Sequence, residues 1–518
     1  MPALPWTPPL PRRLPRTGAA VAAVTLATAG AGCGGGGDEN ADPARIAPPH
    51  SVVYLVATVR PEGEQAQAVD RIGRTVFRVS NPGARLQQLV DRALLRNRAT
   101  RNVSYADDVA PWLGRRVAVV VVPAPGYSRA MAMIFTAGNT DAAGKLVDRV
   151  AREATPRWPR RAYRGVHYRL DPADATAQGV VGDYLVAGDE VAFRAVVDAF
   201  RTGRGLAREP RYRRVAGDAR GKLGFGYLDP TRSGTPPGGA VLAALLGSVG
   251  AAGSGPVTLS LSAAPDRIRV DVAAPGTGAA PRSDGITPLV ARLPGDVWLA
   301  LGLRGVGRSL RLALDRLGPP RGALRRAVDG AVRARTGLDL DRDLVPALGD
   351  IAFFVRGSTV SSVGAGVVVA TPDPASARRL VARLRRLVRH AAGGRTATAS
   401  LAGARGFRAS GSHLPGTVYV VASGDRVVAA RGVAAARAAL APGAGLARSP
   451  QYRAAQASLG GAPPAMLVAF APVAALVGTS TSPEAQRASA YLTALRTLVL
   501  AWAAAGPRHT GRMVVTLR

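Results

Sequence analysis

The second half of this 518-residue chain repeats the order of motifs in its first half. An internal repeat constrains the fold of a chain more than any local motif does. Residues 108–114 (DVAPWLG) align with residues 343–349 (DLVPALG), and residues 206–212 (LAREPRY) align with residues 446–452 (LARSPQY). The spacing between the copies drifts by only a few residues, as loop insertions would cause. The sequence therefore predicts two tandem homologous units.

We place the two units at residues 46–285 and 286–518, each long enough for its own hydrophobic core. Short apolar segments of strand length occur in adjacent pairs, helical segments occur in blocks, and strict alternation of strand and helix is absent. This pattern predicts an α+β fold in which each unit is a mainly antiparallel sheet with helices packed on it. An alternative for the uncharged stretch 238–265 is a membrane span, but its six glycines and Pro256 favour a buried helix and strand.

The N-terminus has the order of charged, apolar and small residues that is typical of a signal peptide. Three arginines within residues 12–16 precede the uncharged stretch 17–32, which ends in Ala-Gly directly before Cys33, the only cysteine of the chain. Small residues before a cysteine are typical of bacterial lipoproteins, in which the thiol is acylated. We therefore predict a lipoprotein-type signal peptide at residues 1–32 and a lipid on Cys33. An ordinary signal peptide followed by an incidental cysteine is the alternative.

The residues after Cys33 support the lipid anchor. Four glycines and then polar residues make 33–45 a predicted flexible tether between a lipid and a folded body. A single cysteine also excludes internal disulfides and a thiolate metal cluster. The prediction for location is the extracytoplasmic side, with the protein anchored to the outer face of the cell membrane.

Three motifs of the first half indicate a family. These are the opening strand at residues 48–56 (PPHSVVYLV), the following residues 59–63 (VRPEG), and residues 111–114 (PWLG). In these motifs the chain resembles a family of bacterial, mainly actinobacterial, predicted lipoproteins known as domain-of-unknown-function family 3352. The family has no established activity, so the resemblance implies a location and assigns no site residue.

Charge is distributed unevenly along the chain, whose formal net charge is +34. Residues 286–518 carry 31 arginines against 10 acids, and many of these arginines fall in a predicted amphipathic helix at residues 373–390. Clustered arginine is attracted to anionic surfaces. We therefore expect this helix to contact an anionic lipid or wall polymer, whereas nucleic acid is not expected outside the cell. The candidate anion-binding residues are Arg378, Arg379, Arg383, Arg385, Arg386 and Arg389. A helix packed on its sheet with a solvated arginine face is the alternative.

The sequence contains no recognisable catalytic motif. The five histidines have no metal-ligand spacing and no Gly-x-Ser-x-Gly elbow occurs, so we predict no catalytic residue, no metal and no cofactor. The function that this suggests is non-catalytic binding or structure in the cell envelope. An envelope hydrolase with an unrecognised site is the alternative. Its best candidates are the paired acids, Asp107, Asp108, Asp341 and Asp343, which otherwise serve turns and helix caps.

Overall fold

In the computed structural model, helices and antiparallel strands form an α+β fold, which confirms the predicted fold class. The structure describes residues 37–77, 81–96, 100–124, 127–219, 221–232, 255–275, 289–316, 322–336, 339–391, 394–411, 414, 416–441, 445–505 and 508–518. Cys33 and the predicted signal peptide lie outside these residues.

The described residues divide into two compact units. The first unit holds the residues up to 232 together with 255–265, and the second unit holds 266–275 and the residues from 289 onward. This division differs from the predicted one at 285/286 because the strand Arg267–Pro275 pairs along its whole length with the last strand of the chain, Arg508–Leu517.

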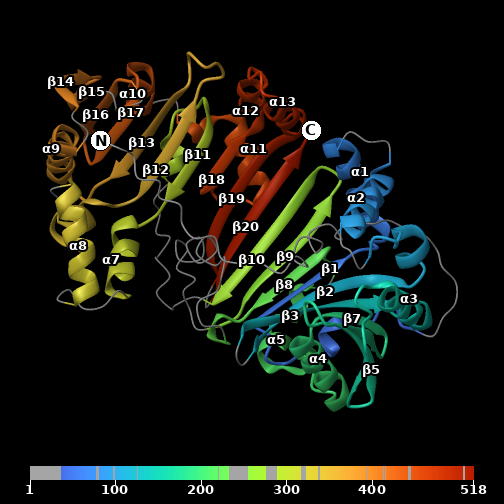
Figure 1. The fold of residues 1–518 in the computed structure, drawn as a ribbon. Helices are drawn as coiled ribbons and strands as arrows, with labels where there is room; N and C mark the ends of the chain where they lie inside the picture. The colour runs from blue at the N-terminus through green and yellow to red at the C-terminus, as the bar shows by residue number, and fades with distance from the viewer. Residues whose placement is uncertain are drawn as a thin grey trace. The chain divides into compact units, whose positions relative to one another are not determined.

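The first unit is a single antiparallel sheet with helices on it (Figure 1). Its strands are β1 (Val53–Thr58), β2 (Leu113–Ala124), β3 (Tyr127–Ala137), β4 (Arg160–Tyr163), β5 (Val166–Asp171), β6 (Thr176–Val181), β7 (Tyr184–Asp189), β8 (Gly224–Leu228) and β9 (Val257–Ala264). Its helices are α1 (Gly63–Phe77), α2 (Pro82–Arg96), α3 (Thr140–Glu153), α4 (Glu190–Thr202) and α5 (Pro210–Arg213), with the short helices η3 (Pro43–Arg45), η4 (Tyr105–Val109), η5 (Leu206–Arg208), η6 (Ala216–Ala219) and η7 (Pro230–Arg232). The strands pair in the order β9–β8–β1–β2–β3–β7–β6–β5–β4.

The second unit is built on a longer antiparallel sheet. Its strands are β10 (Arg267–Pro275), β11 (Val297–Leu303), β12 (Ile351–Arg356), β13 (Gly364–Ala370), β14 (Arg395–Leu401), β15 (Ala404–Ser410), β16 (Val418–Ser423), β17 (Arg426–Arg431), β18 (Met466–Ala469), β19 (Leu495–Ala505) and β20 (Arg508–Leu517). Its helices are α7 (Val306–Arg316), α8 (Ala323–Thr336), α9 (Pro374–Ala391), α10 (Val433–Leu440), α11 (Pro450–Ser458), α12 (Phe470–Gly478) and α13 (Pro483–Leu492), with η8 (Leu289–Arg292), η9 (Leu340–Leu344), η10 (Val345–Ala347) and η11 (Leu446–Arg448). The strands pair in the order β10–β20–β19–β18–β11–β12–β13–β17–β16–β15–β14.

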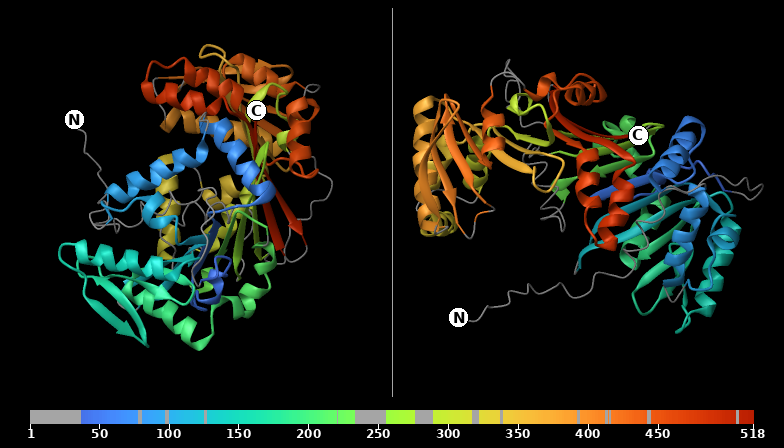
Figure 2. Two further views of the ribbon diagram at one scale, coloured as in Figure 1. Left: turned by 90° about the vertical axis from the view of Figure 1, so that its right-hand side faces the viewer. Right: turned by 90° about the horizontal axis from the view of Figure 1, so that it is seen from above.

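Each sheet has one face that is covered along most of its length. In the first unit that face packs on α4 and α5, where Tyr54 contacts the ring of Tyr212. In the second unit the corresponding core contains Phe354 of β12 and Tyr452 of α11. The opposite face is covered mainly toward one end, by α3 in the first unit and by α9 along β14–β17 in the second (Figures 1 and 2).

The predicted tether at 33–45 is shorter than the sequence suggested. Ala41, Ala44 and Ile46 are buried in the core of the first unit, and the carboxylate of Asp42 caps η3 by accepting a hydrogen bond from the amide of Ala44 (3.0 Å). Small apolar residues beside Pro43 gain more from burial than from solvation, so the chain packs from residue 41 onward.

The described helices include none that is long and apolar enough to cross a membrane. Part of the uncharged stretch 238–265 lies outside the described residues. Its last part forms strand β9, as the sequence analysis preferred.

Candidate functional site

Several strands of the second unit are apolar on both faces, although only one face is fully covered. Side chains alternate between the two faces along a strand, so the pairing register assigns each residue to a face. The covered face is fully buried across six strands. It contains Ala300, Ala352, Phe354, Val368, Leu467, Val499 and Val514.

The other face of these strands is apolar but only partly covered, and we call it the open face of the second unit. Phe353 of β12 pairs with Leu301 of β11, which in turn pairs with Met466 of β18, so the three side chains lie on the same side of the sheet. Phe353 remains 37% exposed. The open face comprises Ile268, Val270, Val272, Leu299, Leu301, Leu303, Ile351, Phe353, Val355, Val367, Met466, Val468, Leu498, Leu500, Trp502, Met513 and Val515, none of which is buried.

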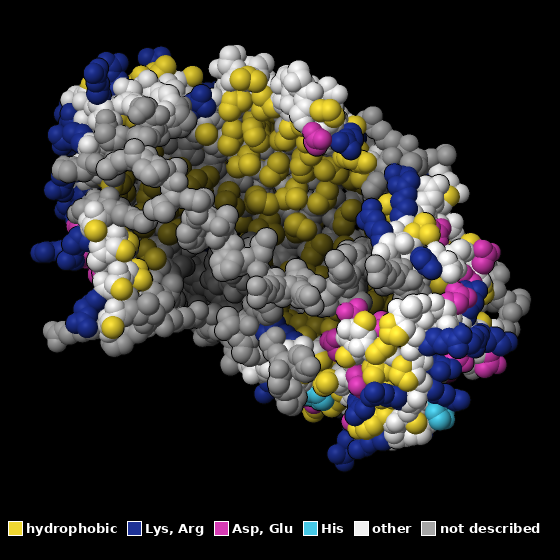
Figure 3. Space-filling model, viewed as in Figure 1, with side chains coloured by type: hydrophobic (Ala, Val, Ile, Leu, Met, Phe, Trp, Pro, Cys, Tyr) yellow, Lys and Arg dark blue, Asp and Glu magenta, His cyan; other side chains and the backbone are white. Residues whose placement is uncertain are grey.

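Figure 3 shows hydrophobic side chains gathered over β11 and β18–β20, where the open face lies. The backbone there is fully engaged in the strand ladder, so the surface offers side chains alone. The indole of Trp502 lies flat across β20 at Gly511, since a Cβ added to that glycine would approach the ring to 2.0 Å. A glycine is therefore required opposite Trp502.

Two elements border the open face. On the same side of the sheet, α9 packs on Val427 of β17, which pairs with Val369 of β13. At the other border of the open face, α12 contacts β19 and β11, and Ala474 is the only side chain of α12 that is buried. The open face therefore ends at an arginine-rich helix on one side and an apolar helix on the other.

The first unit has a smaller surface of the same kind. Leu55 of β1 is 47% exposed and Leu259 of β9 is 38% exposed, while Tyr54, which points to the covered face, is fully buried. Val119 and Met133 are opposite each other on β2 and β3 and belong to the same partly covered side. Alternation between a buried and an uncovered apolar face is therefore common to both units.

The six candidate anion-binding arginines all lie on α9, which begins where Asp373 accepts a hydrogen bond from the amide of Ser376 (2.7 Å). Arg378, Arg379, Arg386 and Arg389 are exposed, whereas Arg383 and Arg385 are half-buried. The guanidinium of Arg379 donates to Ser376 and that of Arg385 to Thr396. The arginine clustering in the sequence gave no indication of these local contacts.

Arg383 serves a different purpose from its neighbours, because it forms an ion pair with Asp343 of η9 at 2.8 Å and also donates to the carbonyl of that residue. The first unit has the same arrangement, in which Arg149 of α3 forms an ion pair with Asp108 of η4. A pair that joins the corresponding helix and turn in each unit has a structural role. Arg383 is therefore a poor candidate for binding an external anion.

The acids proposed for the alternative hydrolase are occupied by structural contacts. Asp107 accepts a hydrogen bond from the hydroxyl of Ser104, and Asp341 forms an ion pair with Arg325 of α8 at 2.5 Å. Hydrogen bonds from the backbone of Arg342 and from the Arg333 guanidinium hold the pKa of the neighbouring Asp339 below its usual value. Within the described part of the chain, no group of three or more His, Cys, Asp or Glu side chains could hold a metal ion.

The structure thus defines an α+β protein with large antiparallel sheets and uncovered apolar sheet surfaces. A family described as protein of unknown function (DUF3352) has a model that matches residues 17–235 of this chain, the family that the sequence motifs of the first half indicated. No curated protein matches the chain.

Among solved structures, the chain is similar at 12% identity to TP0453 in crystal forms I, III and IV. The TM-scores are 0.26, 0.27 and 0.25, and the matches cover 46%, 47% and 45% of this chain and 80%, 84% and 80% of those chains. A likeness at this level does not define a shared fold.

Proposed function

We propose that this protein is a non-catalytic, lipid-binding lipoprotein of the cell envelope, in which the open face of the second unit binds the acyl chains of an anionic amphiphile. The observation that carries the proposal is the open face itself. Its 17 side chains are apolar, and Phe353 among them is 37% exposed. Soluble proteins rarely expose a contiguous apolar surface of more than a few hundred Å², and larger ones are typical of binding sites.

Acyl chains suit this surface better than a polar polymer does. The strand backbone is engaged in the ladder and the open face carries no charged side chain, so apart from the indole N–H of Trp502 it has no polar group for hydroxyl or phosphate groups. Burial of apolar area contributes about 25 cal/mol per Å², and a flat row of Leu, Val and Met side chains provides that area without directional contacts.

The charge beside the open face favours an anionic head group. Val369 of β13 links the two regions, since it pairs with Ile351 of the open face and with Val427 under α9. Exposed arginines of α9 therefore lie on the same side of the sheet as the apolar surface. Of the two anionic partners that the sequence suggested, this arrangement supports the lipid over the wall polymer.

We also propose that the two units arose as a tandem repeat. The strands pair in the same succession in both units, which is β1–β2–β3–β7 in the first and β11–β12–β13–β17 in the second. In both units a pair of helices joins the first two of these strands, and a further helix follows the third. The Arg149–Asp108 and Arg383–Asp343 ion pairs support the same correspondence. The repeat explains why both sheets have an uncovered apolar side.

Titration with dansyl-undecanoic acid tests the binding proposal. The substitution Phe353→Ser is expected to weaken binding of this fluorescent fatty acid about tenfold, because loss of a large aromatic contact amounts to more than about 1.4 kcal/mol. The matched control is Val360→Ser, which changes a side chain that is 75% exposed but lies in the turn between β12 and β13, away from the open face. Equal affinities of the wild type and Phe353→Ser would refute the assignment of the open face.

The proposed location is tested separately by metabolic labelling with a palmitate analogue. If Cys33 carries the lipid and anchors the protein to the outer face of the cell membrane, Cys33→Ser should abolish the label and release the protein from the membrane fraction. Equal labelling of the wild type and the variant would exclude the anchor, while the binding titration would stand on its own.

A further inference from the structure

The sheet of the second unit ends at β14, which pairs with β15 alone among the described strands (Figure 1). Its seven residues have the sequence RTATASL, in which Arg395 is the only charged residue and proline does not occur. An edge strand leaves half of its backbone N–H and C=O groups without a ladder partner, and proteins usually protect such an edge by short length, charge or proline. The edge at β14 is therefore long and little protected.

The turn between β14 and β15 determines which backbone groups of β14 point outward. Ala402 and Gly403 have φ angles of 47° and 80°, as in a two-residue type I′ turn, so Leu401 and Ala404 form the hydrogen-bonded pair that closes the hairpin. Hydrogen-bonded pairs alternate along an antiparallel ladder. The outward N–H and C=O groups therefore belong to Thr396, Thr398 and Ser400. Among the described residues, none forms a hydrogen bond with these outward groups.

The outward edge of β14 is accessible to another strand. Thr398 and Ser400 are exposed, and Thr396 is half-buried beside α9, where its hydroxyl accepts a hydrogen bond from the guanidinium of Arg385 (3.4 Å). The central side chains of the strand are those of Ala, Thr and Ser, which are small and leave room for the side chains of an added strand.

The charge around this edge is positive. Residues 374–424, from α9 through β16, contain nine arginines and no acidic residue. Arg378 is exposed and lies two turns before Arg385, on the same side of α9. Arg405 of β15 is also exposed and pairs with Ser400, so both side chains point to the face of the sheet that α9 covers. A partner that lies along β14 therefore meets several guanidinium groups.

The outer strand of the first unit differs in length and in charge. Strand β4 has four residues, two of which are Arg160 and Arg161. Arg161 forms an ion pair with Glu190 at 3.5 Å, and Arg164 in the following turn forms one with Asp198 at 2.9 Å. A short strand that carries charged side chains is typical of a protected edge. Of these two edges, that of β14 is the one suited to binding a further strand.

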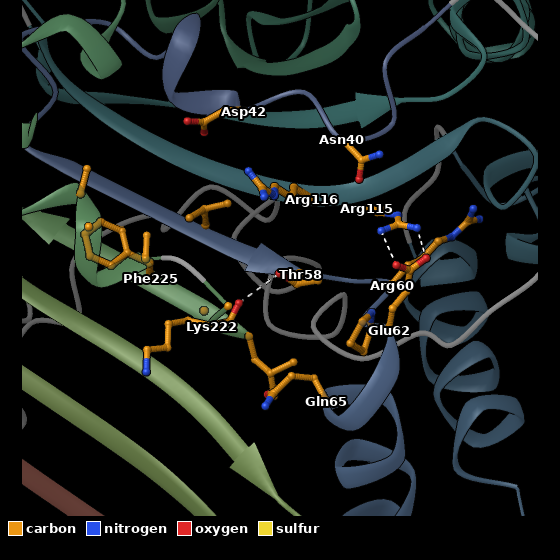
Figure 4. Close-up of a pocket in the computed structure, with 18 of the residues that line it drawn as sticks. Asn40, Asp42, Thr58, Arg60, Glu62, Gln65, Arg115, Arg116, Lys222 and Phe225 are labelled. Atoms are coloured by element: carbon orange, nitrogen blue, oxygen red, sulfur yellow. Dashed lines mark hydrogen bonds and ion pairs between the residues drawn. The ribbon is translucent and has the colours of Figure 1, made fainter.

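Where arginines gather in the first unit, acids accompany them. A cavity of about 730 Å³ lies beside the ends of β1, β2 and β8, and we call it the cationic cavity (Figure 4). Its charged lining residues are Arg60, Arg115, Arg116, Arg213, Lys222, Asp42 and Glu62. In Figure 4, Arg115 is paired with Glu62, and the side chains of Arg116 and Lys222 extend in opposite directions. The positive charge of this cavity is therefore partly neutralised and does not converge on one point.

We propose that the outer edge of β14 binds an extended acidic segment of a partner protein, which adds one strand to the sheet of the second unit. The backbone of the added strand pairs with Thr396, Thr398 and Ser400, and its carboxylates meet the arginines of α9 and β15. Backbone pairing supplies affinity, and charge selects the partner. A second copy of this chain fits less well, because pairing β14 with itself brings two arginine-rich regions together. This site uses backbone groups and does not depend on the proposed acyl-chain binding.

Fluorescence anisotropy of a fluorescein-labelled heptapeptide of alternating Thr and Glu, titrated with the full chain, tests the proposal. The wild type is expected to bind this peptide at low salt. A peptide with Lys in place of Glu should bind at least about tenfold more weakly, because its charge is reversed. The Thr-Glu peptide with N-methyl groups on two adjacent central amides should also bind at least about tenfold more weakly, because it keeps its charge and loses backbone donors.

The substitution Thr398→Pro tests the same pairing from the side of the protein. The amide of Thr398 points outward, so proline removes a donor to the added strand without removing a ladder bond to β15. Binding of the Thr-Glu peptide should weaken at least about tenfold. The matched control is Ala162→Pro, which changes an outward amide of the edge strand β4 and should leave peptide binding unchanged.

Failure of the wild type to bind the Thr-Glu peptide, or equal binding by Thr398→Pro, overturns the site. Equal binding of the N-methylated peptide overturns it as well, since charge alone would then explain the attraction. If Thr398→Pro unfolds the second unit, which hydrogen exchange reports, the N-methylated peptide with the wild type decides. A dimer of the wild type in analytical ultracentrifugation that Thr398→Pro dissociates would identify a second copy as the occupant and overturn the acidic partner.

Discussion

The two units have the same alternation of apolar side chains between the two faces of the sheet, but they differ in their charged residues. In both, one face of the sheet is buried and the other is only partly covered. The helix α3 of the first unit mixes acids with basic residues, whereas α9 of the second unit is rich in arginine. A cavity of the first unit is lined by Arg60, Arg115, Arg116, Arg213 and Lys222. Apolar positions therefore determine the shared architecture, and charged positions distinguish the surfaces of the two units.

The junction between the second helix and the following turn shows the same contrast on a smaller scale. In the first unit, Asp91 of α2 accepts a hydrogen bond from the backbone amide of Tyr105 at 2.6 Å. In the second unit, Arg325 of α8 is buried and forms ion pairs with Asp341 and Asp329. The same junction is thus held by a single hydrogen bond in one unit and by a charged cluster in the other.

The largest expected effect concerns that buried cluster. Arg325 is 1% exposed, so Arg325→Ala leaves a cavity and removes two ion pairs, which should cost about 2–4 kcal/mol of the free energy of unfolding of the second unit. Asp91→Ala should cost the first unit less, about 1–2 kcal/mol, because only one hydrogen bond is lost. Hydrogen exchange followed by mass spectrometry reports each unit separately. Equal losses in the two units would contradict the contrast.

A somewhat smaller effect is expected for membrane binding through α9. Arg378 and Arg389 are exposed and contribute about 1 kcal/mol each near an anionic surface, so their double replacement by Gln should weaken binding to phosphatidylglycerol vesicles about 30-fold at low salt. The control is the double variant Lys145→Gln, Arg152→Gln on α3, which should bind these vesicles nearly as well as the wild type. If the wild type fails to bind such vesicles, α9 has only a solvated arginine face.

The ion pairs that join corresponding elements should behave alike in the two units. Asp108→Ala and Asp343→Ala should each lower the free energy of unfolding of their own unit by about 0.5–1 kcal/mol, because both pairs are partly screened by solvent. Chemical denaturation with unit-specific hydrogen exchange measures both. A loss confined to one variant would weaken the proposal of a tandem repeat.

The smallest expected effect is on the acid sensitivity of unfolding of the first unit, through Asp229. Burial alone raises the pKa of Asp229, but hydrogen bonds from the hydroxyl and amide of Thr231, together with the charge of Arg232, outweigh it and lower the pKa below the usual value. The stabilisation is therefore present above the unfolded-state pKa of about 4 and is lost as pH falls through the folded-state pKa. The second unit has Phe470 directly after β18, where the first has Asp229 after β8.

The contribution of Asp229 to the stability of the first unit should accordingly be lost between about pH 5 and pH 2. In Asp229→Asn, unfolding of the first unit should become less acid-sensitive over this range, whereas unfolding of the second unit should not change. Thermal unfolding monitored by hydrogen exchange at several pH values measures this, and an unchanged pH profile in the variant would exclude Asp229 as the cause.

The sequence predicted the elements well where a pattern was local. The apolar stripe of α9 contains Leu380 and Val381, and both are buried against the sheet as the helical spacing indicated. The candidate site was predicted less well. The arginines were found from their clustering, but the pairing of Arg383 with Asp343 depends on a contact between residues 40 positions apart in the chain.

The open face and the cationic cavity were not predicted at all. The apolar runs of β12 and β19 look the same in sequence whether one face is covered or both, and such runs usually indicate burial on both faces. Arg116 gave no signal beside Arg115, because only the fold shows which of two adjacent arginines has a partner. Which face of a sheet is covered by helices depends on contacts between segments that are distant in the chain, so only the tertiary structure shows it.

By itself, the sequence determined the α+β class, the division into strand pairs and helical blocks, and the similarity of residues 17–235 to a family of unknown function, because these depend on the local order of apolar and turn residues. Only the tertiary structure decided which face of each sheet remains uncovered, that β10 belongs with β20, and that Arg116 and Lys222 share one cavity. These features arise where segments distant in the chain meet, and side-chain alternation fixes two faces without specifying what covers either of them.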